Sequence, residues 1–331
     1  MLQIDIEVCR RQMTVSFACV LQPSERLALV GHSGAGKSTV LEAVAGLAPL
    51  RSGSVRFDGE ILVAPSKRGR GPRRGGRHVG LLTQDPRLFP HLGIAENLAY
   101  STRSDSTEVN QLAADLGIKE ILSAYPGSVS GGQAQRAALG RLLASRPDVL
   151  LLDEPFSALD LATRRELMSV VLRWLDHHPC PAILVTHDLA EAQAFGHRVG
   201  VMDLGKLAQV SDPSEVVLRP QSLRVAALVG YSGFLPIGAD RSVGVHPAMA
   251  TTSPLMTGSS DQLNFEATVV RCVASGPRWL CELTVGEVVV LAGSPQYWPE
   301  GEKVSLVLST APVFAPDGML VQQLDSSREC A

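Results

Sequence analysis

The sequence has little of what a disulfide framework or a cysteine-based metal site requires. Its six cysteines are scattered, and no two of them are separated by only two residues: they are Cys9, Cys19, Cys180, Cys272, Cys281 and Cys330. Zinc sites usually contain closely spaced cysteine or histidine pairs, and small disulfide-rich domains contain cysteine at high density. We therefore expect free thiols in a reducing compartment.

Long apolar runs are also missing. No run approaches the roughly 18–20 residues that span a bilayer, and the most apolar stretches, "VLLLDEP" (149–155) and "AILVTHD" (182–188), have the length of strands. The first residues, "MLQIDIEVCRRQ", include acidic side chains and no apolar core, so they do not resemble a signal peptide. We expect any work at a membrane to be done through a partner.

The sequence has no large excess of positive or of negative charge. The formal net charge of -3 argues against a protein that coats nucleic acid, and we predict no nucleic-acid partner. One dense basic run, "SKRGRGPRRGGRH" (66–78), has no aromatic residues between its charges. Single-stranded nucleic acids are usually held by such aromatics, so this run is better interpreted as a solvated, mobile loop.

The 331 residues are enough for a large and a small domain. Segments 3–9 and 13–21 alternate apolar and polar residues, as half-buried antiparallel strands do. By contrast, segments 149–155 and 182–188 are apolar runs that end in polar residues, which is typical of buried parallel strands with chemistry at their carboxyl ends. Helical patterns between about 85 and 145 predict a helical insert.

The character of the sequence changes near residue 230. The segment "YSGFLPIGADRSVG" (231–244) has the composition of a loop, and several strand-sized runs follow it. Gly286 lies between two of these runs, where a hairpin turn requires it. We predict one domain over 1–230 and a small all-β barrel over 231–331.

A glycine-rich segment, "GHSGAGKST", fits the pattern GxxxxGK[ST] and lies between an apolar strand and a helical pattern. Successive backbone N–H groups in such a loop form a concave anion site at a helix N-terminus. Lys37 is expected to reach the β- and γ-phosphates of a nucleotide, and Ser38 to bind Mg²⁺. The candidate ATP-binding residues are Gly31, His32, Ser33, Gly34, Ala35, Gly36, Lys37, Ser38 and Thr39. The predicted fold class is an α/β P-loop nucleotide-binding domain with an antiparallel β subdomain and a helical insert, followed by the small all-β barrel.

Two acidic residues end the apolar run 149–155. Asp153 is placed to hold Mg²⁺, directly or through water, and Glu154 can polarise a water for in-line attack on the γ-phosphate. Gln84 and His187 also follow strand-like segments. Gln84 is either a surface residue or a contact to the metal or the attacking water. His187 is either structural or a side chain that holds the γ-phosphate or orients water.

A second glycine motif occurs in "SVSGGQAQR", at Ser130, Gly131, Gly132 and Gln133. Ser130 precedes a helical pattern and is typical of an N-cap. A helix that begins with two glycines presents unobstructed N–H groups and is a further candidate anion site. A capped helix with a glycine turn explains the local pattern equally well.

The order of these motifs resembles the ATP-binding-cassette (ABC) ATPases over about residues 1–230. The motifs are Gly31–Thr39, Gln84, Ser130–Gln133, Asp153–Glu154, "SALD" at Ser157–Asp160, and His187. The resemblance implies that Ser130–Gln133 is a signature motif, with Val129 where the family favours leucine, and that it contacts ATP held by a second copy of the chain. It also implies a head-to-tail dimer that binds two ATP with Mg²⁺, in which Ser157 and Asp160 form the D-loop linking the two sites.

A single cassette followed by a small β barrel is similar to the ATPase subunits of bacterial importers. The segment "RHVGLLTQDPRLFPHLGIAENLAYS" (77–101) is most similar to the molybdate importer ATPases. The resemblance implies a peripheral protein on the cytoplasmic face of the plasma membrane. Its partners would be permease subunits and, indirectly, a solute-binding protein. Gln84 would sense the permease, which would dock in a groove formed by the helical insert.

The sequence departs from the family at two points. The family's aromatic residue that stacks on adenine is missing from the segment before Gln12, where Ile6, Val8 or Arg11 are the candidates to cover the ring. The β domain also lacks the "SARN"-like opening of molybdate-binding modules. An importer for sugar, polyamine or iron remains an alternative, as does a non-transport ABC ATPase. Non-transport members usually carry a coiled-coil insert or two cassettes, and this sequence has neither pattern. A small-molecule kinase would leave Ser130–Gln133 and His187 unexplained.

Overall fold

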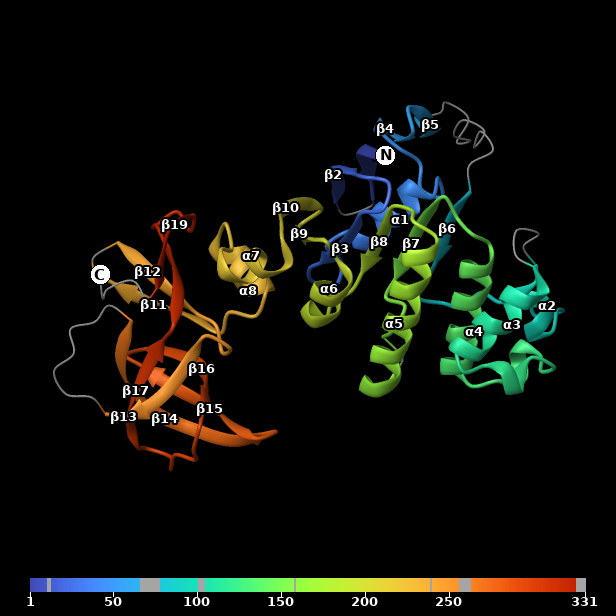
Figure 1. Cartoon of the computed structure of the whole chain (residues 1–331). Helices are drawn as coiled ribbons and strands as arrows, with labels where there is room; N and C mark the ends of the chain where they lie inside the picture. Colours follow the sequence, from blue (N-terminus) through green and yellow to red (C-terminus); the bar gives the residue numbers. More distant parts are fainter. Residues whose placement is uncertain are drawn as a thin grey trace. The chain divides into compact units, whose positions relative to one another are not determined.

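The computed structural model describes residues 1–10, 13–65, 78–100, 105–157, 159–238, 240–255 and 263–325. The basic run predicted to be a solvated loop lies, except for His78, outside the described residues. The chain divides into two compact units, Met1–Pro213 and Ser214–Ala331 (Figure 1). The predicted boundary at 230 lies further along the chain, after α7 (Pro213–Leu218) and α8 (Leu223–Leu228). Those two helices precede the change to β-rich sequence, which is why composition assigned them to the first domain.

The first unit contains a ten-stranded sheet in the order β5-β4-β1-β2-β10-β9-β3-β8-β7-β6. The strands are β1 (Leu2–Cys9), β2 (Thr14–Leu21), β3 (Arg26–Val30), β4 (Ser52–Phe57), β5 (Glu60–Val63), β6 (Val79–Leu82), β7 (Val149–Asp153), β8 (Ala182–Val185), β9 (Arg198–Asp203) and β10 (Lys206–Ser211). The block β9-β3-β8-β7-β6 is parallel, and β5-β4-β1-β2 is antiparallel. Strands β7 and β8 are buried along their whole length, as expected for a parallel sheet covered on both faces. This confirms the predicted α/β fold with an antiparallel part.

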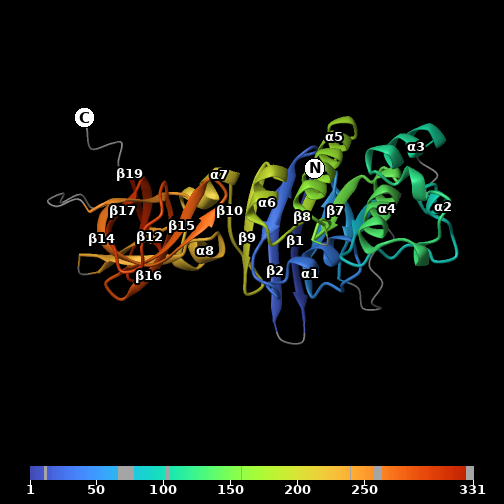
Figure 2. The same cartoon turned by 90° about the horizontal axis from the view of Figure 1, so that it is seen from below.

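In the described part of the first unit, six α-helices precede α7: α1 (Lys37–Val44), α2 (Ile94–Leu98), α3 (Ser106–Asp115), α4 (Gly131–Ala144), α5 (Leu161–His177) and α6 (Leu189–Phe195). The turns η1 (Lys119–Ile121) and η2 (Pro126–Ser128) connect α3 to α4. Helices α2, α3 and α4 lie together to one side of α5 (Figures 1 and 2). They occupy the predicted helical insert. The helices α3, α4, α5 and α6 each begin at a side chain that accepts a backbone N–H bond.

Glycine is required in β4 for a steric reason. Gly53 has φ +85°, and a Cβ atom at this position would lie 2.0 Å from the carbonyl oxygen of Asp5 in the neighbouring strand β1. Gly59 also has a positive φ, +83°, in the tight turn between β4 and β5, but a Cβ there would meet no atom within 4 Å. A comparison of the two positions therefore separates the cost of a positive φ from the cost of a steric clash.

We expect Gly53→Ala to lower the free energy of unfolding of the first unit by about 3 kcal/mol, because strain and a clash combine. Gly59→Ala is the matched control and should cost about 1 kcal/mol from strain alone. The measurement is the urea midpoint followed by the fluorescence of Trp174, with Trp279 and Trp298 changed to phenylalanine. Equal losses in the two variants would contradict the steric argument.

The second unit contains a closed barrel, β13-β16-β15-β14-β17, and a four-stranded sheet, β11-β12-β18-β19. The strands are β11 (Gly233–Ile237), β12 (Arg241–Val245), β13 (Ala250–Pro254), β14 (Asn264–Ser275), β15 (Arg278–Val285), β16 (Val288–Ser294), β17 (Lys303–Leu308), β18 (Thr310–Phe314) and β19 (Leu320–Asp325). The predicted barrel and the hairpin turn at Gly286 are confirmed, because Val285 pairs with Val288 and Gly286 has φ +59°.

One interpretation of this region was wrong. The segment 231–244 is not a loop, because most of it forms the paired strands β11 and β12. Its proline and glycines weaken the strand pattern in the sequence. Pro236 is nevertheless tolerated, because β11 lies at the edge of its sheet. The alternating residues Leu235, Val243 and Val245 are fully buried in the core of the second unit.

The described residues include five of the six cysteines of the sequence. Within them the cysteines Cys9, Cys19, Cys180, Cys272 and Cys281 are free. Over the same part of the chain, no three His, Cys, Asp or Glu side chains gather as a metal site would require. No described helix has both the length and the apolar character needed to cross a membrane.

Candidate functional site

The loop between β3 and α1 is built on glycines with positive φ. Gly31, Gly34 and Gly36 have φ values of +150°, +80° and +98°. A Cβ atom at Gly31 would lie 2.3 Å from the carbonyl oxygen of Met202, so only glycine fits there. His32, Ser33 and Gly34 are exposed, as is Ser38 in the first turn of α1. The result is an open loop that leads into a helix N-terminus, the geometry of an anion site.

Lys37 is held across this loop. Its Nζ donates to the carbonyl oxygens of Gly31, at 2.8 Å, and His32, at 3.0 Å. Burial lowers the pKa of Lys37, and the carboxylates of Glu154 and Asp153 oppose that shift. The site therefore places a largely buried cation between a backbone cradle and two acids, where it can meet a multiply charged anion.

Ser38 and Asp153 are brought together from segments far apart in the sequence. The Ser38 hydroxyl donates to Oδ1 of Asp153 over 3.1 Å. Burial raises the pKa of Asp153, against the Ser38 hydrogen bond, which lowers it. A hydroxyl and a carboxylate at this distance are the hard oxygen ligands that Mg²⁺ prefers. The donor set therefore fits the predicted metal.

Glu154 follows β7 in a strained conformation. Its φ is +47°, which is uncommon outside glycine and often occurs at functional sites. Its N–H donates to the carbonyl of Val185 at 2.9 Å, and its Oε2 lies 3.5 Å from Nδ1 of His187. The Glu154 side chain is 24% exposed and that of His187 is 62% exposed. Both groups are thus available to a ligand that enters from solvent.

A network that the sequence analysis missed flanks His187. Thr186 donates its hydroxyl to Glu191 over 2.5 Å, while Arg164 lies 3.1 Å from both Glu191 and Asp188. Burial raises the pKa of Glu191. Part of the signal was present in the sequence, because "HDLAE" places an N-cap aspartate and a glutamate at the start of a helix. The contact with Arg164 had no local signal.

Gln84 is exposed and lies two residues beyond β6. Strand β6 is in parallel register with β7, where Leu82 pairs with Leu152. The end of β6 is therefore next to the end of β7, which carries Asp153. This places Gln84 at the same sheet edge as the other candidates.

Ser130 caps α4 as the sequence predicted. Its Oγ accepts from the N–H of Gln133 at 3.3 Å, and Oε1 of Gln133 accepts from the N–H of Ser130 at 2.9 Å. A Cβ atom at Gly131 would meet no atom within 4 Å, so the start of the helix is open. In the described part of the chain, the side-chain bonds of Ser130 and Gln133 stay within this capping box and do not reach the loop at Gly31–Lys37.

Helix α4 is nevertheless tied to the segment that follows Glu154. Gln135 is buried, and its Nε2 donates to the carbonyl oxygen of Pro155 at 3.3 Å. Further along, Ser157 donates its hydroxyl to the carbonyl of Glu154 at 3.0 Å. Asp160 caps α5 by accepting the N–H groups of Ala162 and Thr163, both at 3.0 Å. The pKa of Asp160 is lowered, first by the Thr163 hydroxyl.

The residues proposed to cover a nucleotide base are not supported by the structure. Ile6 is 2% exposed and Val8 is fully buried, and both belong to the core of the first unit. Alternating residues of β1 face that core, which is why two apolar side chains near the loop were misinterpreted. Neither can contact a ligand. Arg11 lies outside the described residues.

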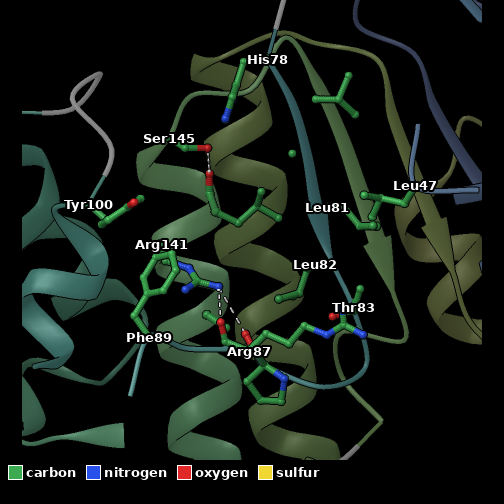
Figure 3. Close-up of a pocket in the computed structure, with 15 residues that line it drawn as sticks. Leu47, His78, Leu81, Leu82, Thr83, Arg87, Phe89, Tyr100, Arg141 and Ser145 are labelled. Atoms are coloured by element: carbon green, nitrogen blue, oxygen red, sulfur yellow. Dashed lines mark hydrogen bonds between the residues drawn. The ribbon is translucent and has the colours of Figure 1, made fainter. Parts of the chain in front are cut away.

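A cavity of about 540 Å³ lies beside β6 and α4 (Figure 3). Tyr100 and Leu47 line its wall and are 62% and 60% exposed. Arg141 reaches across from α4, donates to the carbonyl of Arg87 at 2.9 Å and lies over the ring of Phe89, 4.8 Å from its centroid. The cavity thus borders the segment that begins at Gln84.

Comparison with known proteins places these features in context. A family model described as "ABC transporter" matches residues 15–157. The Fe(3+) ions import ATP-binding protein FbpC of Yersinia pestis is 42% identical over 219 residues, which are 63% of this chain and 60% of that protein. The sulfate/thiosulfate import ATP-binding protein CysA of Bradyrhizobium diazoefficiens is 39% identical over 254 residues, 71% of each chain. The molybdenum import ATP-binding protein ModC of Mycobacterium tuberculosis is 34% identical over 310 residues, 87% of this chain and 82% of that protein.

Solved structures resemble the fold. A dimeric ATP-binding cassette in a post-hydrolysis state, bound to ADP and Pi, superposes with a TM-score of 0.55 at 22% identity, over 64% of this chain and 99% of that chain. An ATP-bound bacterial Atm1-family ABC exporter gives a TM-score of 0.58 at 25% identity, over 69% of this chain and 41% of that one. The chain also spans less than two thirds of the FbpC protein that it matches.

Proposed function

Because this chain belongs to the ABC transporter family of ATP-binding proteins, we propose that it is the ATP-hydrolysing subunit of a bacterial ABC importer. One observation carries the proposal. Lys37, the Ser38–Asp153 pair and the Glu154–His187 pair gather at one edge of the sheet, around an open glycine loop. A cation, a hard-oxygen pair and a carboxylate beside an imidazole are the groups that phosphoryl transfer to water requires.

The roles follow from position. The N–H groups of the loop and Nζ of Lys37 bind the β- and γ-phosphates, and Ser38 and Asp153 would hold Mg²⁺. When bound there, the ion would neutralise charge on the phosphate oxygens. Glu154 accepts a proton from water as the water oxygen forms a bond to the γ-phosphorus, and the bond from that phosphorus to the bridging oxygen breaks to release ADP. His187 orients the water or the γ-phosphate, and Gln84 contacts the metal or the water.

The second glycine motif completes the site in a head-to-tail dimer. Its support is the start of α4, where Ser130 caps the helix and a Cβ atom at Gly131 would meet no atom within 4 Å, because an open helix N-terminus favours an anion. We assign Ser130, Gly131, Gly132 and Gln133 to ATP held by the second copy. Ser157 and Asp160 link the two sites, since Ser157 bonds directly to the backbone of Glu154.

The cavity beside β6 is the proposed docking groove for a permease. Its wall carries the exposed side chains Tyr100 and Leu47, and it is also lined by Thr83, the residue that precedes Gln84. A segment seated there would touch the same stretch of chain that ends at the catalytic edge of the sheet. The protein would then act as a peripheral subunit on the cytoplasmic face of the membrane, supplied indirectly by a solute-binding protein.

Molybdate, or another oxyanion, is the proposed solute. The support is that the match to the molybdenum import protein runs through both units and covers 87% of this chain. Iron is the second candidate, because the FbpC match has the higher identity, 42%, over 63% of the chain. Sulfate belongs to the oxyanion class and is tested beside molybdate.

We expect the full-length protein, expressed with its neighbouring membrane subunits, to copurify from membranes with a hydrophobic partner. After reconstitution, molybdate with its binding protein should raise ATP hydrolysis several-fold, and iron(III) should not. The panel also contains tungstate, sulfate, a sugar and a polyamine. Stimulation by iron alone would overturn the oxyanion assignment, and copurification with ribosomes or DNA would overturn the importer.

A further inference from the structure

Two cysteines that eight residues separate in the sequence are paired in the structure. They belong to the hairpin of β14 and β15 in the closed barrel, and every residue of that hairpin is described. In its register Cys272 is directly opposite Cys281. Side chains of directly opposite residues lie on the same face of a sheet. The barrel therefore brings together two thiols whose spacing in the sequence gives no sign of contact.

The turn of the hairpin shows which kind of pair the cysteines form. Ser275 and Arg278 flank a turn of two residues, and residues in these positions form a hydrogen-bonded pair. Hydrogen-bonded and non-hydrogen-bonded pairs alternate along the strands. Cys272 and Cys281 lie three pairs further from the turn, so theirs is a non-hydrogen-bonded pair. Cα atoms in such a pair are about 4.5 Å apart, within the range of roughly 4.4–6.8 Å that a disulfide bond spans.

The two thiols differ in how far they are open to solvent. Cys281 is fully buried in the core of the second unit, and Cys272 is half-buried against that core. Burial raises the pKa of the Cys281 thiol, and a side-chain hydrogen bond with Cys272 raises it further. That hydrogen bond places the two sulfur atoms next to each other. A reagent from solvent therefore meets Cys272 first, while Cys281 stays a protonated thiol in contact with it.

We propose that Cys272 and Cys281 are a thiol pair that a low-molecular-weight disulfide converts into an intramolecular disulfide bond. The Cys272 thiolate attacks one sulfur of the reagent, which breaks the reagent's S–S bond, forms a mixed disulfide and releases one thiolate. Cys281 then loses its proton to solvent, its sulfur attacks Sγ of Cys272, and the second thiolate leaves. The cysteine pair loses two electrons, one reagent molecule is reduced to two thiols, and the two protons end on those thiols.

The test uses the full-length protein and oxidised glutathione, and it does not depend on ATP hydrolysis. Trypsin cleaves after Arg271, Arg278 and Lys303, so the two cysteines fall in separate peptides, 272–278 and 279–303. We expect mass spectrometry to find these peptides joined in most of the protein, with a mass lower than their sum by two hydrogen atoms. Dithiothreitol should restore both thiols.

Two controls separate the paired positions from cysteine reactivity in general. Cys9 is exposed and opposite Thr14, so it should form only a mixed disulfide with glutathione. The variant Cys272→Ser/Val273→Cys moves the thiol one residue along β14, onto the other face of the sheet. Val273 is exposed, so the new thiol should react with glutathione but form no link to Cys281.

Amide hydrogen exchange of β14 and β15 shows whether the bond fits the folded barrel. A disulfide restricts the unfolded chain, so oxidation should slow exchange in these strands about tenfold. The variant Cys272→Ser should show no such change. Faster exchange after oxidation would mean that the bond distorts the hairpin and would overturn the proposal. Reaction that stops at a mixed disulfide, no reaction of either cysteine, or an equal link from Val273→Cys would overturn it as well.

Discussion

Glu154→Gln is expected to lower kcat for ATP hydrolysis by about a thousandfold, the middle of the range for loss of a general base. The amide keeps the size of the side chain and its proximity to His187, but it cannot take a proton from water. ATP binding should be preserved, because Lys37 and the glycine loop are untouched. We therefore expect ATP to accumulate unhydrolysed in a dimer.

Phosphate release measures the rate, and size-exclusion chromatography with Mg²⁺ and ATP measures the dimer. Glu166→Gln is the matched control: this residue is an exposed glutamate on α5, so the same change of charge should leave both readings as they are. Hydrolysis by Glu154→Gln at the unmodified rate would show that another group is the base. Loss of ATP binding would show that Glu154 has a structural role.

Ser130→Arg is expected to lower ATP hydrolysis at least a hundredfold while ATP binding to the monomer changes less than twofold. A long cation at the start of α4 fills the space where the partner's phosphates would lie, and loss of anion-binding donors of this kind costs about 10²–10³ in rate. The same chain's glycine loop is not altered. A large loss of hydrolysis with little change in ATP binding to the monomer would indicate a site shared between two chains.

The change also removes an N-cap, which is worth about 1 kcal/mol to the helix. Ser130→Asp keeps the cap and brings a negative charge toward the phosphates, so it should reproduce the loss of hydrolysis without loss of stability. Ser128→Arg places the same cation two residues earlier, on an exposed serine outside the capping box, and should be neutral. Parallel loss of binding and hydrolysis in Ser130→Asp would argue that the motif serves its own chain's nucleotide.

Much of the fold was predictable because its signals are local. The loop at Gly31 is specified by glycines that alone tolerate its backbone angles, and β7 and β8 are specified by continuous apolar runs. The capping box at Ser130 was likewise predictable from residues three apart. Each of these features depends on residues within a few positions of one another, so each can be predicted from the sequence alone.

Non-local contacts were not predictable in the same way. The hairpin of β11 and β12 depends on pairing with β18, which lies far along the chain, and its proline concealed it. The burial of Val8 depends on which face of β1 meets the core. Arg164 joins the His187 flank only because α5 and α6 are brought together in space. A single sequence gives no local signal for such a contact, because the contact depends on how the strands and helices are connected in space.

The hydrogen bond between Gln135 and Pro155 couples α4 to the segment that follows Glu154. Breaking this buried hydrogen bond would cost free energy, because no water is available there to pair with the donor or the acceptor. Any rotation of α4 must therefore pull on the carbonyl that immediately follows Glu154, a residue already held at φ +47°. Arg141 of the same helix bonds to the segment after Gln84, so we expect a displacement of the helical insert to reach the backbone next to Glu154, the proposed base. Helix α4 thus bonds both to the segment after Gln84 and to the segment after Glu154, so it connects the proposed docking groove with the proposed base.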